Sequence, residues 1–256
     1  MVSTVANAKG PFGLAAVVGM LALSTAVNSP LNWMLLAVAV GGTWLGTTFV
    51  LKGPLEGRDW PRVALSYWVL PGGVALGGGL WLQLVLGDDL RWVGLATTGL
   101  LLAVTWYLQC SHIGGRSWMS IQPNLCIHLV SYAVAFALFV TIKQLHLPAP
   151  LHLLALGVTS ALLVLEIFRD MRVGAGRLAL YAGAVALFMT EGAWGLTFWS
   201  IGAVTFGLIL LLIYYTVAGI AHRHLAGGLT RWTAFEFIAV ALVGIAMIYG
   251  SRQWIG

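Results

Sequence analysis

The composition of this 256-residue chain is that of an integral membrane protein. Hydrophobic residues make up 60% of it and charged residues 8%, and the mean hydropathy is +0.93. Soluble domains carry roughly 25% charged residues, so a water-soluble fold is excluded. The apolar residues form stretches of about 16 to 25 residues, the length that an α-helix needs to cross a bilayer. We therefore predict an all-α, polytopic bundle of transmembrane helices.

The net charge of +5 and the two cysteines both have explanations in a membrane setting. Basic residues in a chain of this kind set its topology, so nucleic acid is not an expected partner. The expected partners are membrane lipid and other membrane protein subunits, contacted through Gly-rich helix faces. Cys110 and Cys126 fall near the cytoplasmic ends of adjacent predicted helices, where thiols stay reduced. We interpret them as small core residues and not as a disulfide.

The apolar stretches predict a single integral membrane domain, residues 1–256, with about nine spans. The breaks between spans are no longer than roughly 14 residues, which leaves no room for a soluble catalytic domain. The first span weakly resembles a signal peptide, but Asn28-Ser29-Pro30 is typical of a tight turn and favours a two-helix hairpin. The predicted spans are residues 11–27, 31–51, 62–86, 91–109, 122–143, 150–168, 176–194, 198–220 and 232–250.

The basic residues predict the orientation of these spans. Cytoplasmic loops of membrane proteins carry an excess of Lys and Arg. With the N-terminus in the cytoplasm and the C-terminus outside, the external basic residues are Arg91, Lys143 and Arg252. The cytoplasmic ones are then Lys9, Lys52, Arg58, Arg62, Arg116, Arg169, Arg172, Arg177, Arg223 and Arg231. This distribution favours that orientation, and the short loops favour a prokaryotic cytoplasmic membrane.

Glycine spacing predicts close packing between helices. Gly42 and Gly46 in the second span, and Gly73 and Gly77 in the third, each have the small-xxx-small spacing that lets helix backbones approach in lipid. The third span also contains Pro71, followed by a run rich in glycine. Such a run is typical either of a broken helix at a transporter binding site or of a kinked helix packed against a neighbour. We favour the packed helix.

One group of candidate binding residues falls near the cytoplasmic side. Glu166 lies near the end of the sixth span and shares a helix face with Arg169, so a local ion pair accounts for it. Glu236 lies at the start of the ninth span, and His128 lies about one turn into the fifth. If these groups converge beside Arg116, they form a polar pocket for a proton, a cation or an anionic headgroup.

Glu191 is the most distinctive acidic residue. It lies near the outer end of the seventh span and is followed by Trp194 and Trp199. One hypothesis is an outward-facing site in which the carboxylate binds a cation or a proton against aromatic walls. The other is an interfacial carboxylate in an aromatic belt, with Gly192 and Gly195 making a short turn. The sequence is equally compatible with both.

Other polar motifs indicate no catalytic or metal site. His222 and His224 are separated by one residue, a spacing that can hold a metal ion. Two potential metal ligands without a third nearby are more typical of a solvated basic loop. The polar segment from Gln109 to Ser117 is interpreted as a connecting loop and not as an anion cradle. His128 is the only histidine clearly within an apolar span, which argues against a bis-His haem pair. The sequence also has no nucleotide-binding or protease motif.

Two classes of function remain open. The first is a non-catalytic membrane component, either a subunit of a larger complex or a small permease-like carrier for transport. Scarce charge at the midplane favours the subunit slightly. The neutral polar residues able to line a path for an uncharged solute are Thr43, Thr47, Thr48, Ser131, Tyr132, Thr159, Ser160, Tyr181 and Thr205.

The alternative class is an intramembrane enzyme acting on a lipid or a lipid-linked substrate. In that hypothesis His128, Glu166 and Glu236 supply acid–base chemistry, and Arg116 or Arg169 holds a phosphate. These side chains must then lie within hydrogen-bond reach of one reacting atom.

Overall fold

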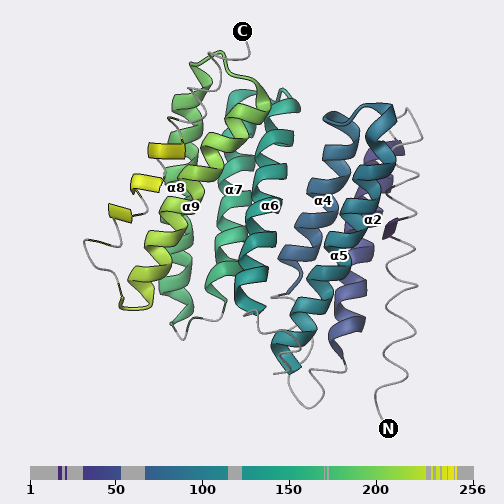
Figure 1. The fold of residues 1–256 in the computed structure, drawn as a ribbon, viewed down its shortest axis with the longest axis horizontal. Coiled ribbons are helices and arrows are strands. Elements are labelled where there is room, and N and C mark those ends of the chain that lie inside the picture. The colour runs from purple at the N-terminus through teal and green to yellow at the C-terminus, as the bar shows by residue number, and fades with distance from the viewer. Residues whose placement is uncertain are drawn as a thin grey trace. The chain divides into compact units, whose positions relative to one another are not determined.

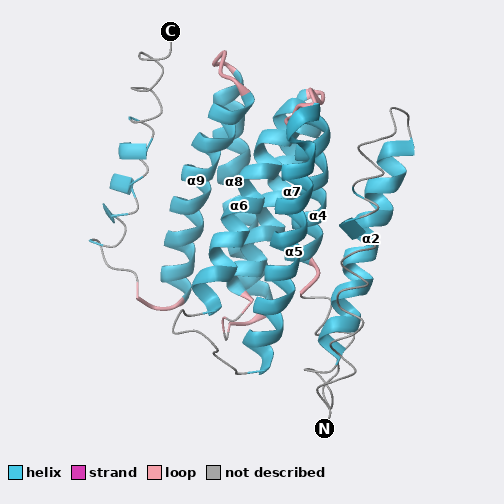
Figure 2. Cartoon of the chain, turned by 45° about the vertical axis from the view of Figure 1, so that its right-hand side comes forward, coloured by secondary structure: helices cyan, strands magenta, loops and turns pink. Residues whose placement is uncertain are grey.

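Every regular element that the structure describes is a helix (Figures 1 and 2). The computed structural model describes residues 17–18, 21, 31–52, 67–114, 123–169, 171, 173–228, 232, 235–236, 238–240, 242–244 and 246. The predicted all-α class is confirmed for these residues. The predicted span 11–27 lies largely outside them, and the predicted span 232–250 lies partly outside them.

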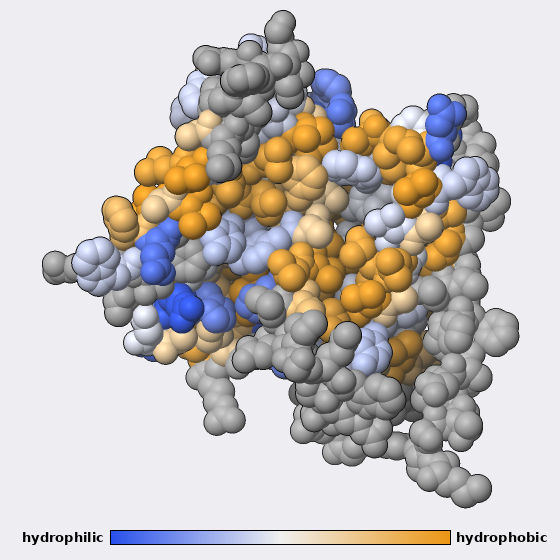
Figure 3. Space-filling view, viewed as in Figure 1, coloured by the Kyte–Doolittle hydropathy of each residue, from blue (hydrophilic) through white to orange (hydrophobic). Residues whose placement is uncertain are grey.

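Six of the described helices are long and apolar enough to cross a membrane. They are α2 (Leu31–Lys52), α5 (Arg91–Gly114), α6 (Pro123–Gln144), α7 (Ala149–Phe168), α8 (Ala175–Thr197) and α9 (Ala203–Leu225). A shorter apolar helix, α4 (Val69–Leu84), follows α2, and a 3-10 turn, η1 (Asp88–Leu90), leads into α5. Figure 3 shows a face on which hydrophobic side chains cover much of the described surface, with hydrophilic side chains gathered in smaller patches. This distribution suits helices that cross a bilayer.

The helix α5 is longer than the sequence analysis predicted. It continues beyond residue 109 to Gly114, so the polar segment that begins at Gln109 is helical at least that far. No proline or glycine interrupts the chain between these two residues, and polar side chains alone do not end a helix. The predicted connecting loop is therefore wrong for residues 109–114, while residues 115–117 lie outside the described part.

The connection between α8 and α9 also differs from the prediction. Gly192 and Gly195 are helical, because α8 continues to Thr197 and α9 begins only at Ala203. A glycine inside a helix costs about 1 kcal/mol relative to alanine, which packing of the remaining face can offset. The predicted glycine turn is wrong, and the chain reverses between Phe198 and Gly202 instead.

The chain divides into two compact units, a first unit of Met1–Val134 and a second unit of Ala135–Gly256. In the first unit α4 packs against α2 and α5, and in the second unit α8 packs against α7 and α9. The boundary between the units falls within α6, so the two halves of this helix belong to different units.

The glycine-rich run of α4 is a packing surface in an unbroken helix. Pro71 is tolerated because it lies in the first turn, where its missing N–H removes no intrahelical hydrogen bond. A Cβ added at Gly78 would lie 2.4 Å from Thr98 Cγ2 of α5, and one at Gly79 would lie 2.3 Å from Leu36 Cδ1 of α2. Neighbouring side chains thus lie directly on the glycines, as the packed-helix interpretation requires.

Indole N–H groups connect α2 to its neighbours in the first unit. Trp106 Nε1 of α5 donates to Thr47 Oγ1 at 2.9 Å, and Trp68 Nε1 donates to Thr48 Oγ1 at 3.0 Å. The Trp68 ring also stacks on Trp44, with centroids 5.5 Å apart. Two threonines that the sequence analysis assigned to a polar path therefore accept hydrogen bonds that hold the helices together.

In the second unit α9 approaches the second half of α6 closely. A Cβ at Gly207 would lie 2.3 Å from Val140 Cγ2 and 3.3 Å from the Val140 backbone nitrogen. Phe139 and Tyr214 pack edge to face beside this contact, with ring centroids 6.0 Å apart, and both rings are buried. The absence of a side chain at Gly207 is therefore a condition of this packing.

Candidate functional site

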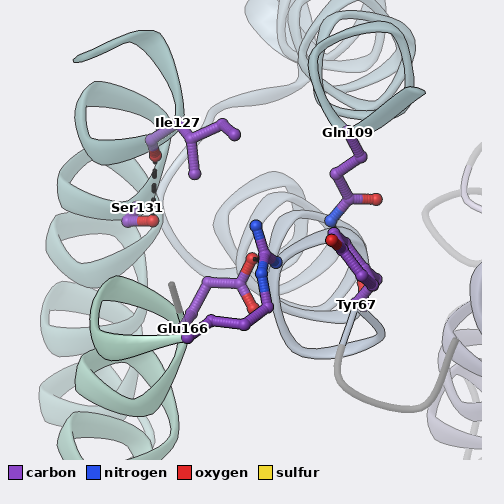
Figure 4. A network of polar contacts seen from close by, with 6 residues as sticks. Tyr67, Gln109, Ile127, Ser131 and Glu166 are labelled. Atoms are coloured by element: carbon purple, nitrogen blue, oxygen red, sulfur yellow. Dashed lines mark hydrogen bonds and ion pairs between the residues drawn. The ribbon is translucent and has the colours of Figure 1, made fainter. Parts of the chain in front are cut away.

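The carboxylate of Glu166 forms a buried ion pair at the end of α7. Glu166 (Figure 4) is 4% exposed. Its Oε1 accepts a hydrogen bond from Arg169 Nη1, three residues further along. Each charge offsets the desolvation of the other, which is what permits a carboxylate to be buried here. The local ion pair predicted from the sequence spacing is confirmed.

The other residues of the predicted cytoplasmic group lie in different settings. Glu236 is exposed, and His128 is partly buried on the first half of α6. His128 belongs to the first unit, whereas Glu166 and Glu236 belong to the second. Arg116 lies outside the described residues. The convergence of these groups therefore stays a prediction.

Glu191, Trp194 and Trp199 are exposed at the end of α8 and in the turn that follows it. Glu191 and Trp194 are three residues apart and share one face of the helix. Trp194 contacts Phe198 edge to face, with ring centroids 5.5 Å apart. Exposed aromatic rings at a helix end are typical of a membrane interface. The Glu191 carboxylate is thus exposed on the surface of the second unit.

The two histidines of the His222-Arg223-His224 motif contact different aromatic residues. Tyr181 Oη and His224 Nδ1 are 2.7 Å apart and hydrogen-bonded, which joins the first part of α8 to the last turn of α9. The His222 ring packs against Phe168, with centroids 6.3 Å apart. Among the described residues, no three side chains are grouped so that they could hold a metal ion.

The opposite end of the second unit holds a buried histidine that the sequence analysis overlooked. His152, in the first turn of α7, is 6% exposed, and its ring centroid lies 5.7 Å from that of Phe206. Lys143 Nζ lies 4.8 Å from the centre of the same phenylalanine ring, a cation–π contact. The prediction that His128 is the only histidine within an apolar span is wrong. His152 could have been identified from the sequence, because it lies inside the predicted span 150–168.

A buried amide connects two helices of the first unit. Gln109 of α5 is fully buried, and its Nε2 donates to the Tyr67 carbonyl oxygen at 3.1 Å (Figure 4). Its Oε1 has no hydrogen-bond partner among the described residues. This bond fixes the start of α4 against the last turns of α5. Gln109 was predicted to lie in a loop, so its structural role could not be recognised from the sequence.

Most of the hydroxyl groups proposed to line a solute path are hydrogen-bonded within their own helices. Each donates to a carbonyl oxygen three or four residues earlier, an arrangement that needs no external partner. The residues that do so are Thr43, Thr47, Thr48, Ser131 and Ser160. Their presence in the spans is thus explained without a bound solute.

A family model described as "Protein of unknown function (DUF5656)" matches residues 16–250. The chain belongs to the DUF5656 family. The match extends over both units and over all the helices named above. No curated protein and no solved structure matches the chain. Membership of the DUF5656 family assigns no activity to the chain.

Proposed function

We propose that this member of the DUF5656 family is a non-catalytic subunit of a larger membrane complex. In this proposal it has about nine spans, a cytoplasmic N-terminus and an external C-terminus, and it resides in a prokaryotic cytoplasmic membrane. The observation that carries the subunit role is the exposed face of α8, which combines small residues with an exposed carboxylate.

The small residues of this face leave room for another helix. Gly176, Ala179 and Gly183 are exposed and spaced so that they lie along one side of α8. A Cβ added at either glycine would meet no atom within 4 Å. Neighbouring side chains lie directly on Gly78 and Gly79 of α4, whereas these two glycines are open. Small residues of this spacing let a second helix pack closely in lipid.

The carboxylate on the same face indicates the chemistry of the partner. Glu191 lies eight residues beyond Gly183, on the same side of α8, and is exposed. A carboxylate that faces lipid is costly, so it favours a partner helix with a Lys, an Arg or a hydrogen-bond donor opposite. Two copies of this chain, joined through this face by a two-fold axis, would oppose two Glu191 carboxylates, and like charges repel. The proposed partner is therefore a different protein.

A carrier or a lipid-modifying enzyme has less support from the described side chains. Both need polar groups that are available to a substrate. Glu166 is engaged with Arg169, and the hydroxyl groups of Thr47 and Ser160 are bonded within their helices. This engagement favours a role in which the shape of the helix faces matters more than chemistry in the bundle.

The subunit role is tested by purification in nanodiscs followed by native mass spectrometry. We expect the wild-type chain to retain one other membrane protein in fixed stoichiometry. Gly183→Leu fills the open face, and we expect it to reduce the retained partner at least about tenfold, as expected for loss of close helix packing. Glu191→Leu should weaken retention as well.

Gly41→Leu is the matched control, because a Cβ at Gly41 also meets no atom within 4 Å but lies on α2. It should retain the partner as the wild type does. A wild-type chain that carries only lipid, or a partner held equally by all variants, would contradict the proposal.

The orientation is tested by single-cysteine labelling in cells, with Cys110 and Cys126 first replaced by alanine. Ser200 follows α8 and Ala226 follows α9, and both are exposed, at opposite ends of α9. We expect Ser200→Cys to react with a membrane-impermeant maleimide in intact cells, and Ala226→Cys to react only after permeabilisation. The reverse pattern would show that the proposed orientation is inverted.

A further inference from the structure

The end of the second unit at which α8 begins and α9 ends carries an exposed group of basic side chains. The hydrogen bond between Tyr181 Oη and His224 Nδ1 holds the two helices together there, and the ring centroids are 5.7 Å apart. Arg177 lies one turn before Tyr181 on α8, and Arg223 precedes His224 on α9. Because residues four apart share a helix face, the Tyr181–His224 contact brings Arg177 towards the end of α9.

The two arginines of this group are not neutralised within the part of the chain that the structure describes. Both are exposed, and no described carboxylate forms an ion pair with either of them. The carboxylate of Glu166 is engaged with Arg169, and Glu236 is exposed on a separate segment. The positive charge at this end is therefore available to an external anion.

Helix electrostatics account for Arg223 and His224 but not for Arg177. Cations are favoured at the C-terminal end of a helix, where Arg223 and His224 lie. Arg177 lies in the first turn of α8, which contains no acidic residue, and a cation is disfavoured there by the helix dipole. An anion held beside Arg177 would reverse that unfavourable interaction.

The donors present match the oxygens of a phosphate group. Guanidinium groups donate paired hydrogen bonds to phosphate. When the Tyr181 hydroxyl donates to His224 Nδ1, the imidazole proton is on Nε2, which is then a further donor. At the end of a membrane-length helix, the phosphate groups within reach are those of phospholipid headgroups.

We propose that Arg177, Arg223 and His224, with Tyr181 positioning the imidazole, bind the phosphate of an anionic phospholipid headgroup. This site uses side chains at the helix ends and does not depend on the partner proposed for the α8 face. It makes this end of the second unit a point at which lipid composition is recognised.

The test is native mass spectrometry of the delipidated full-length chain, titrated with phosphatidylglycerol, with phosphatidylcholine or with inorganic phosphate. We expect phosphatidylglycerol to bind at least about tenfold more tightly than phosphatidylcholine. The double variant Arg177→Gln/Arg223→Gln should remove this preference. Tyr181→Phe, which loses the hydrogen bond to His224, should weaken phosphatidylglycerol binding about threefold.

Lys143→Gln is the control, because Lys143 lies at the opposite end of the same unit. It should leave the preference unchanged, and the thermal stability of every variant checks that it is folded. Equal binding of the two lipids, or equal loss in Lys143→Gln and the double arginine variant, would overturn the proposal. Displacement of the lipid by inorganic phosphate at the same concentration would overturn it too, and would assign the side chains to free phosphate.

Discussion

Replacement of Glu166 by glutamine should lower the free energy of unfolding by about 3 kcal/mol. The variant leaves the Arg169 guanidinium, whose side chain is 11% exposed, without its carboxylate partner. Breaking a buried pair costs roughly 3–5 kcal/mol, because an uncompensated charge is left behind. The lower end of that range applies here, since Arg169 follows the last residue of α7 and can extend towards the interface. The effect is measured by thermal unfolding in detergent, with the folded fraction at each temperature read by size-exclusion chromatography.

The double variant Glu166→Leu/Arg169→Leu is the control for this prediction. It removes both charges, so most of the lost stability should return, as happens when buried ion pairs are replaced by apolar residues. If Glu166→Gln unfolds at the wild-type temperature, the pair is not structural. The Glu166 carboxylate would then be a candidate for proton or substrate binding, as the enzyme hypothesis requires.

Substitution of Gly207 by alanine should destabilise the second unit by about 2 kcal/mol, within the range of 1–3 kcal/mol for overpacking. The added methyl group would lie 2.3 Å from Val140 Cγ2 and 3.3 Å from the Val140 backbone nitrogen. The second contact is with backbone, so rotation of a side chain cannot relieve it, and α9 must move away from α6. Thermal unfolding should show a fall in Tm of roughly 4–8 °C.

Gly183→Ala is the matched control for Gly207→Ala. Gly183 lies in the middle of α8, and a Cβ there meets no atom within 4 Å. Alanine has the higher helix propensity, so this variant should unfold at the wild-type temperature or slightly above it. Equal destabilisation by the two substitutions would mean that helix propensity, and not the close approach at Gly207, explains the result.

The sequence predicted the helices well where the evidence was local. Long apolar stretches predict α2, α6 and α7 within a residue or two of their observed bounds, because bilayer thickness and hydropathy leave little choice of length. The ends of α5 and α8 were predicted too early. Polar residues and single glycines were interpreted as loop, although neither ends a helix unless capping and packing also favour a turn.

In the candidate site, too, contacts between residues close in sequence were predictable and contacts between distant helices were not. The Glu166–Arg169 pair was predictable, since a spacing of three residues fixes the two side chains on one helix face. Tyr181 and His224 are 43 residues apart, and Thr47 and Trp106 are 59 residues apart. Such contacts depend on the rotation and height of each helix relative to its neighbour. A single sequence does not carry that information.

The position of Glu191 relative to Trp194 makes the surroundings of this carboxylate depend on the thickness of the bilayer. Trp194 is exposed in the last turns of α8, where an indole ring favours the headgroup region. In the proposed orientation Glu191, three residues earlier, would lie about 4.5 Å nearer the bilayer centre along the helix axis. A thicker hydrocarbon layer draws this carboxylate further into apolar surroundings, which raises the cost of leaving it without a partner. Hydrophobic thickness would then tune how strongly α8 associates with a neighbouring helix.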